Sequence, residues 1–328
     1  MHQARGTVVS ALASSGSTDN PADTTSTAVP AGRGLYSPFL EHTWEKLMAS
    51  GYCSADNNVD ASLAANMATA KGFPVGSVVR MENCALEPTT VDGKSSPIRY
   101  ARAALLETLV AAPADADANE PTDDKIHAAG IQVLNLVIFP SKPHLPVFGA
   151  DFVSLPGNKH LLLLDAQPMT SHNENIHNSD NFKDWYAKYC SGEETNFPWG
   201  GAMPEAVTCY VSPNALWTRL GSAAAAKAEK EEGSTSTPTA KTVMEPVALI
   251  QGQLWQAFRE HLDLYLGMLE SQSHKEQEDG VPAVIVEHSR DAYLKYRLEN
   301  DPARPMLKAL YGEEWTEKVL TEVLFPPL

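Results

Sequence analysis

The sequence predicts an α/β fold, a three-layer α/β/α sandwich in which helices flank a central antiparallel β-sheet. Three observations predict it. Strand-like apolar segments occupy the middle of the chain, short connections containing proline or glycine join them, and amphipathic helical patterns occur towards both ends. Parallel strands would need crossovers of about a dozen residues or more, so the short connections favour an antiparallel sheet over a doubly wound fold.

The chain divides into a tail and one domain. Residues 1–34 are rich in Ser, Thr, Ala and Gly and contain no apolar segment of a secretory signal. We expect a disordered tail, which is either the remnant of a plastid transit peptide or a plain flexible extension. Residues 35–328 are expected to form a single catalytic domain with inserted loops near 111–124 and 221–243, where apolar anchors are lacking.

Helices are predicted at both ends of the domain. Ser37 as N-cap and Pro38 in the first turn precede apolar residues at helical spacing. Towards the C-terminus, the segment Leu254–Leu269 repeats apolar residues at i, i+3 and i+4. Another helix is expected from about Val284 to Asn300, because Pro302 prevents its continuation.

The strands are predicted between these helices. They occupy Val75–Met81, Ile98–Leu106, Gly130–Pro140, Val147–Ser154, His160–Asp165 and Tyr210–Trp217. The segments from Gly130 to Asp165 give the strongest signal, and their two short connections indicate an antiparallel meander. Asn135 and Asp151 are polar residues among the apolar neighbours of this sheet.

Composition excludes some classes of partner. A net charge of −16 argues against nucleic acid, because phosphate binding requires a basic face. Much of the acidic charge falls in loop-like segments, so a local basic patch is compatible with the sequence. Its members would be Arg290, Lys295, Arg297, Arg304 and Lys308. The sequence contains no apolar run of about 18 residues, so it predicts no membrane-spanning helix. The four cysteines are irregularly spaced, which predicts free thiols in a reducing compartment.

The familiar cofactor and nucleophile motifs do not occur. No glycine-rich dinucleotide fingerprint follows a predicted strand, and there is no P-loop, no G-x-S-x-G and no H-E-x-x-H. His172 and His177 are five residues apart, which places them on different faces of a helix and argues against a metal site. We therefore expect neither a bound cofactor nor a metal.

Two aspartates are the candidates for chemistry. Asp151 lies in an apolar strand, where burial raises the pKa of a carboxyl group and suits it to donate a proton near neutral pH. Asp301 follows a predicted helix and precedes Pro302. Structural roles are the alternative: Asp151 would cap a turn or face solvent, and Asp301 would end the helix. The residues alone leave both interpretations open.

The chain resembles the ferredoxin-dependent bilin reductases along residues 36–328. The strand block Gly130–Pro140, the segment Leu145–Gly157 and Leu164–Pro168 resemble the central sheet of that family. Matching segments also occur, in the family's order, at Pro38–Trp44, Pro97–Arg99, Pro198–Gly201, Leu216–Arg219, Tyr296–Arg304, Tyr311–Trp315 and Leu324–Phe325. The resemblance implies an α/β/α sandwich that binds an open-chain tetrapyrrole, a bilin, between the sheet and the C-terminal helices.

The resemblance also implies roles for single residues. Asp151 matches the sheet aspartate that protonates the bilin, Asp301 matches an aspartate used in a second protonation, and Arg297 matches an arginine that holds substrate and stabilises anionic intermediates. Asn135 occupies a position that is His or Asp in other branches. Together with the segment from Phe148 to Asp151, it fits the branch that reduces 15,16-dihydrobiliverdin at its A-ring diene.

Further substrate contacts and partners follow as expectations from the resemblance. Arg99 and Arg219 are candidates for binding the two propionates, with ordinary surface ion pairing as the alternative, and Phe148 is a candidate substrate contact. Electrons would come singly from reduced 2Fe–2S ferredoxin, through a bilin radical. We expect a soluble monomer in the plastid of a phycobilin-containing alga, which receives its substrate from an upstream bilin reductase.

Three other functions stay open at this point. One is the reduction of biliverdin to 15,16-dihydrobiliverdin, and another is a four-electron reduction of biliverdin to phycoerythrobilin. A non-enzymatic bilin carrier or chaperone would keep the pocket without the chemistry. The presence of Asp151, Arg297 and Asp301 together favours an enzyme over the carrier.

Overall fold

The computed structural model describes residues 34–57, 59–69, 77–91, 94–110, 130–142, 144–169, 179–191, 203, 208–221, 245–273 and 283–327. The expected tail before Gly34 lies outside the described residues, as does the expected loop near 111–124. The same holds for the expected loop near 221–243, apart from Gly221, and for His172 and His177.

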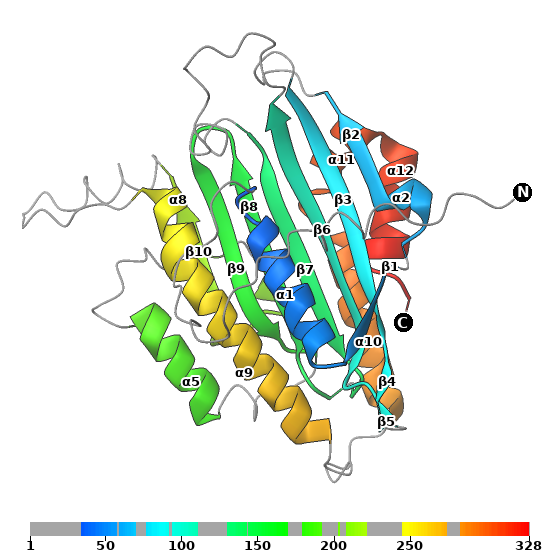
Figure 1. Ribbon diagram of the computed structural model, residues 1–328, viewed down its shortest axis with the longest axis vertical. Coiled ribbons are helices and arrows are strands. Elements are labelled where there is room, and N and C mark those ends of the chain that lie inside the picture. The colour runs from blue at the N-terminus through cyan, green and yellow to red at the C-terminus, as the bar shows by residue number, and fades with distance from the viewer. Residues whose placement is uncertain are drawn as a thin grey trace, which may run out of the picture.

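An antiparallel sheet forms the middle layer (Figure 1). Its strand order is β1-β3-β6-β7-β8-β9-β10, and β2 also pairs with β3. The strands are β1 (Cys53–Asn57), β2 (Ala65–Ala68), β3 (Ser77–Pro88), β6 (Ile98–Val110), β7 (Gln132–Pro140), β8 (Val147–Leu155), β9 (Lys159–Gln167) and β10 (Leu216–Leu220). A separate two-stranded ribbon pairs β4 (Thr90–Val91) with β5 (Lys94–Ser95). All the pairings are antiparallel, which confirms the predicted meander β7-β8-β9.

Helices cover both faces of the sheet. Figure 1 shows α1 and α9 on the near face, with α5 beside α9, and α10, α11 and α12 on the far face. The elements of the near side are α1 (Ser37–Ala49), α5 (Asp180–Tyr186), the π-helical η3 (Ala187–Ser191), α8 (Pro246–Leu249), the π-helical η4 (Ile250–Leu254) and α9 (Trp255–Ser273). Those of the far side are α2 (Ala61–Ala64), α10 (Ala283–Glu299), α11 (Arg304–Tyr311), α12 (Glu313–Lys318) and the π-helical η5 (Val319–Leu324). The sandwich predicted from the sequence is confirmed.

Alternation along the strands divides the interior into two cores. On β8, Phe148 and Phe152 pack with α1 and α9, whereas Val147 and Val153 pack with the far-side helices. The near core is aromatic: the ring of Phe39 lies 5.3 Å from that of Phe152 and 5.1 Å from that of Phe258, measured between centroids. Successive side chains of a strand point to opposite faces, so each strand serves both layers.

Two local predictions were wrong. Helix α1 begins at Ser37, but Tyr36 occupies the N-cap position without a side-chain cap, because the Ser37 hydroxyl donates to Glu107 on β6 instead. The last strand begins at Leu216, not at Tyr210. The residues before it turn, so that the backbone N–H of Ser212 donates to Asp165 over 2.8 Å.

The sequence is compatible with a basic patch, and the structure shows where its residues lie. Arg290 is buried, Arg297 pairs with Asp151, and Arg304 and Lys308 both pair with Glu317. These four cations are therefore buried or paired with carboxylates, and Lys295 lies 3.9 Å from Glu299. Among the described residues, the five cations thus do not form a free positive surface. By contrast, the prediction of free thiols is confirmed for all four cysteines. Among the described residues, no helix is long and apolar enough to cross a membrane.

Candidate active site

Asp151 and Asn135 meet on the face of the sheet that the far-side helices cover. They are register partners on β8 and β7, and the Asn135 side-chain amide Nδ2 donates a hydrogen bond to Asp151 Oδ1. Val133 and Val137 flank Asn135 on the same face and pack with the far-side core. Because directly opposed residues of antiparallel strands share a face, the two polar side chains interrupt an apolar layer at one place.

Arg297 reaches the same carboxyl group from helix α10. Its Nη2 lies 2.7 Å from Asp151 Oδ2, and the two side chains are only 15% and 26% exposed. Burial lowers the pKa of Arg297, but the charge of Asp151 and its hydrogen bond more than offset this effect and raise the pKa overall. Arg297 is therefore a permanent cation, and Asp151 lies between a guanidinium group and an amide.

Asp301 lies just past the end of α10, one turn after Arg297. Its Oδ1 accepts hydrogen bonds from the backbone N–H groups of Ala303 at 2.8 Å and Arg304 at 3.1 Å. Burial raises the pKa of Asp301, Arg297 lowers it, and the negative charge of Asp151 raises it again. The negative charge of Asp151 thus acts electrostatically on the carboxyl group of Asp301.

Arg102 is a site residue that the sequence analysis missed. It lies on β6, it is fully buried, and its Nη1 donates to Asn135 Oδ1 over 3.4 Å. The guanidinium group packs over the ring of Phe325, with 4.8 Å from Cζ to the ring centroid. Burial lowers the pKa of Arg102 to about 10, which leaves it charged at neutral pH. The detectable signal was a charged residue between Ala101 and Ala103 in an apolar strand.

Two nitrogens of Arg102 have no partner within the part of the chain that the structure describes. Nε and Nη2 are buried there without a hydrogen bond. Buried charged groups are normally paired and hydrogen-bonded, so these nitrogens are spare donors. Asn135 is fixed in turn: its oxygen accepts from Arg102, and its nitrogen therefore points at Asp151.

A neighbouring contact places α10 against the sheet. The hydroxyl of Tyr293 on α10 donates to Gln167 Oε1 on β9. The Gln167 amide lies directly over Gly149, where a Cβ would come within 2.6 Å of Gln167 Nε2. Gly149 is therefore needed for a close approach, and it allows the contact that locates Tyr293, one turn before Arg297.

The structure does not bring every predicted residue into this cluster. Phe148 is on the opposite face, packed against Phe258 and Tyr265 of α9, so it does not contact the Asp151 side of the sheet. Arg99 is exposed at the start of β6. Arg219 is exposed on β10, where it lies over the ring of Trp217; it shares the face of Asp151 but is two strands away.

The cluster is equipped for proton transfer next to developing negative charge. It combines two coupled carboxyl groups, Asp151 and Asp301, with two guanidinium groups, Arg102 and Arg297. Among the described residues, no three His, Cys, Asp or Glu side chains gather as a metal site would require. The groups in place can donate protons and stabilise anions.

A family model and the curated relatives point to the same protein family. A family model described as ferredoxin-dependent bilin reductase matches residues 126–236 and 244–326. The chain is 37% identical over 207 residues to the phycoerythrobilin:ferredoxin oxidoreductase of Prochlorococcus marinus strain MIT 9312, covering 61% of this chain and 69% of that one. It is 34% identical over 206 residues to the protein of that name from Nostoc punctiforme, covering 60% and 66%.

A solved structure agrees with the fold. The tomato phytochromobilin synthase crystallised in complex with biliverdin superposes with a TM-score of 0.56, covering 88% of this chain and 82% of that chain. At 21% identity this likeness supports the architecture alone.

Proposed function

This chain belongs to the ferredoxin-dependent bilin reductase family, and we propose from that premise that it reduces 15,16-dihydrobiliverdin at the A-ring diene to phycoerythrobilin. It is an oxidoreductase, as its relatives are. The observation that carries the finer proposal is the contact of Asp151 with both Asn135 and Arg297. Two relatives named for phycoerythrobilin formation, at 34% and 37% identity, support the same reaction.

The proposed reaction adds two electrons and two protons to the bilin. Reduced ferredoxin supplies the electrons one at a time from its 2Fe–2S cluster, so the chain itself needs no redox group. Each electron leaves the tetrapyrrole more basic, and a positioned carboxylic acid can then protonate it. Asp151 and Asp301 are the proposed donors. Burial raises the pKa of Asp301, which favours the protonated form that a donor requires.

The arginines balance the charge that these transfers leave behind. A carboxyl group that gives up its proton becomes a carboxylate, and a buried carboxylate needs a cation or hydrogen bonds nearby. Arg297 contacts Asp151 directly, and Arg102 interacts electrostatically with Asp151 from β6, two strands away. With two guanidinium groups and two carboxyl groups, the site can stay near neutrality after both transfers. The spare donors of Arg102 would also stabilise a reduced, anionic bilin.

The proposal also covers the propionate contacts, the oligomeric state and the location of the protein. Arg99 and Arg219 stay candidates for the propionates, and their exposure suits groups at the rim of a site. We propose a monomer that takes substrate from an upstream reductase and that works in a plastid. The plastid location stays a prediction, since residues 1–33 lie outside the described residues and the relatives cited above are cyanobacterial.

An anaerobic assay with two bilins tests the reaction. The protein would be incubated with reduced ferredoxin and either 15,16-dihydrobiliverdin or biliverdin, and the products separated by chromatography. We expect phycoerythrobilin from the first and unchanged biliverdin from the second. Formation of 15,16-dihydrobiliverdin from biliverdin would assign the preceding step instead, and phycoerythrobilin from both would indicate a four-electron reductase. Binding without reduction of either would indicate a carrier.

A further inference from the structure

The turn before Asp301 lacks one backbone hydrogen-bond donor, because residue 302 is a proline. In an α-helix the carbonyl of residue i accepts from the N–H of residue i+4. The corresponding donor for Leu298, in the last turn of α10, would be residue 302, which is a proline and has no N–H. The end of α10, directly before Asp301, therefore needs a donor from elsewhere.

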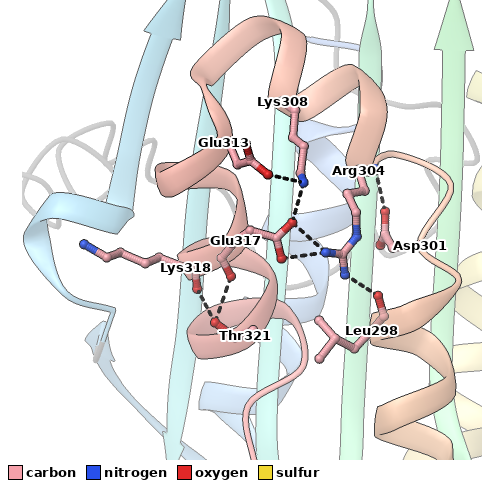
Figure 2. A network of polar contacts seen from close by, with 8 residues as sticks. All are labelled: Leu298, Asp301, Arg304, Lys308, Glu313, Glu317, Lys318 and Thr321. Carbon is pink, nitrogen blue, oxygen red and sulfur yellow. Dashed lines mark hydrogen bonds and ion pairs between the residues drawn. The ribbon is translucent and has the colours of Figure 1, made fainter.

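Arg304 provides this donor and fixes the turn at three points (Figure 2). Its Nη2 donates to the Leu298 carbonyl, its Nη1 donates to both carboxylate oxygens of Glu317 on α12, and its backbone N–H donates to Asp301 Oδ1 over 3.1 Å. One residue thus bonds to the end of α10, to α12 and to the candidate proton donor. A planar guanidinium with donors in fixed directions suits this task better than a lysine ammonium.

Both backbone hydrogen bonds to Asp301, from Ala303 and Arg304, fall on Oδ1. Within the described part of the chain, Oδ2 receives no hydrogen bond, so it is the oxygen free to carry the proton. The orientation of the carboxyl group therefore depends on the backbone of residues 303 and 304, which the Arg304 side chain anchors.

We propose that Arg304, held by Glu317, is a positioning residue that orients the carboxyl group of Asp301 for proton transfer to the bilin. This inference rests on the proposed function. The ion pair itself contributes little to the stability of the fold, because both partners are partly exposed. It acts by positioning the carboxyl group of Asp301, because a small displacement of a reacting group lowers the rate by a large factor.

The proposal implies a definite change in pH dependence. The groups acting on Asp301 are its own burial, Arg297 on α10, Asp151 on β8 and the two backbone N–H donors. The N–H donors lower the pKa of Asp301. Loosening of the turn removes them, so the pKa of Asp301 rises further. An acid with a higher pKa keeps its proton to higher pH, and the alkaline limb of the rate profile then moves to higher pH.

Lys308 offers a matched control. Its Nζ also contacts Glu317, at 2.9 Å, and Glu313, at 3.0 Å (Figure 2). In the described residues it makes no hydrogen bond to Leu298 or Asp301. The Lys308→Gln substitution therefore removes one cation from Glu317 and leaves the turn intact, whereas Arg304→Gln removes the anchor.

The experiment compares wild type, Arg304→Gln, Arg304→Lys and Lys308→Gln in the full chain. We expect Arg304→Gln to lower kcat by about ten- to a hundredfold, with little change in the bilin Kd, and to shift the alkaline limb to higher pH. Arg304→Lys should recover part of the rate, and Lys308→Gln should match wild type. Amide hydrogen exchange at residues 303 and 304, measured without substrate, should accelerate most in Arg304→Gln, less in Arg304→Lys and not in Lys308→Gln.

The outcomes that contradict the positioning role differ from the outcome that contradicts the proposed function. If Arg304→Gln keeps the wild-type kcat and pH profile, or if Lys308→Gln loses as much activity as Arg304→Gln, the positioning role is wrong. Unchanged amide exchange at residues 303 and 304 would also overturn it, because the turn would not depend on the side chain. If wild type itself reduces no bilin, the proposed function fails, and the exchange data still report on the anchor.

Discussion

On the α9 side of the sheet, β8 presents Phe148, Ala150 and Phe152 to a cluster of aromatic rings, whereas on the α10 side the alternate residues of the same strand include Gly149 and Asp151. Five consecutive residues, Phe148 to Phe152, thus serve two faces of the sheet. The near face gains stability from apolar area removed from water. On the far face, part of the interior consists of polar groups that meet across strands. The two faces thus separate residues that stabilise the fold from residues that we propose to carry the chemistry.

The largest expected effect is a loss of stability on the near face. Phe258 is fully buried against Phe39, Phe148 and Phe152. Phe258→Ala should lower the free energy of unfolding by about 3–5 kcal/mol, measured by urea denaturation. The rate per folded molecule should stay near wild type, because the side chain does not reach the Asp151 face. A large fall in kcat without a loss of stability would contradict the assignment of stability to the near face and of catalysis to the far face.

On the far face, Arg102→Met should show the reverse pattern. Replacing a buried, poorly paired charge by an apolar side chain of similar length is often close to neutral for stability. Catalysis should fall by about ten- to a hundredfold, as expected for a lost hydrogen bond to a charged group worth about 1.5–3 kcal/mol. Urea denaturation and steady-state kinetics measure the two quantities. Arg80→Met, at a partly exposed arginine of β3, is the control.

A smaller effect is expected where the two layers approach most closely. Gly149→Ala would place a Cβ within 2.6 Å of Gln167 Nε2 and disturb the contact of Gln167 with Tyr293. Overpacking of this kind costs about 1–3 kcal/mol, and displacement of α10 should also raise the bilin Kd. Gly252→Ala in η4 is the matched control, since among the described residues no atom outside its chain neighbours and its own helix backbone lies within 4 Å of the added Cβ. Equal effects at both positions would rule out the close-approach explanation.

The smallest effect concerns Asp165, a fully buried carboxyl group on the far face. Its pKa is raised to about 7, because burial outweighs the hydrogen bonds from the Ser212 hydroxyl and backbone, which lower it. The hydroxyl favours the ionised form, which dominates above pH 7. Ser212→Ala should therefore destabilise the protein by about 1 kcal/mol more at pH 8 than at pH 5.5. Chemical denaturation at the two pH values measures this difference, and a larger cost at the acidic pH would contradict the assigned cause.

Sequence patterns predicted the layers well because periodicity reports which face is buried. Asn135 and Asp151 stood out as polar residues in apolar strands, and their pairing required only the meander. Arg102 was missed although the same argument applied to it, because its partner Asn135 comes 33 positions later, beyond a segment of unpredictable length. Phe148 packs against α9 while Asp151 faces α10, because strand alternation puts residues an odd number of positions apart on opposite faces.

Turns were predicted less well than strands. The strand expected from Tyr210 begins at Leu216, because the buried carboxyl group of Asp165 binds Ser212 and holds the preceding segment in a turn. Likewise Ser37, a typical N-cap residue, donates to Glu107 on a strand instead. Both outcomes depend on tertiary partners far away in the sequence, which local propensity does not contain.

The central claim is that Asp151 and Asp301 deliver the two protons to a bilin reduced by ferredoxin. The most direct measurement is an anaerobic single turnover of 15,16-dihydrobiliverdin followed by absorption and electron paramagnetic resonance in wild type, Asp151→Asn and Asp301→Asn. The account predicts phycoerythrobilin from wild type and a persistent bilin radical with little product from each variant. Product formation at the wild-type rate by both variants would contradict it.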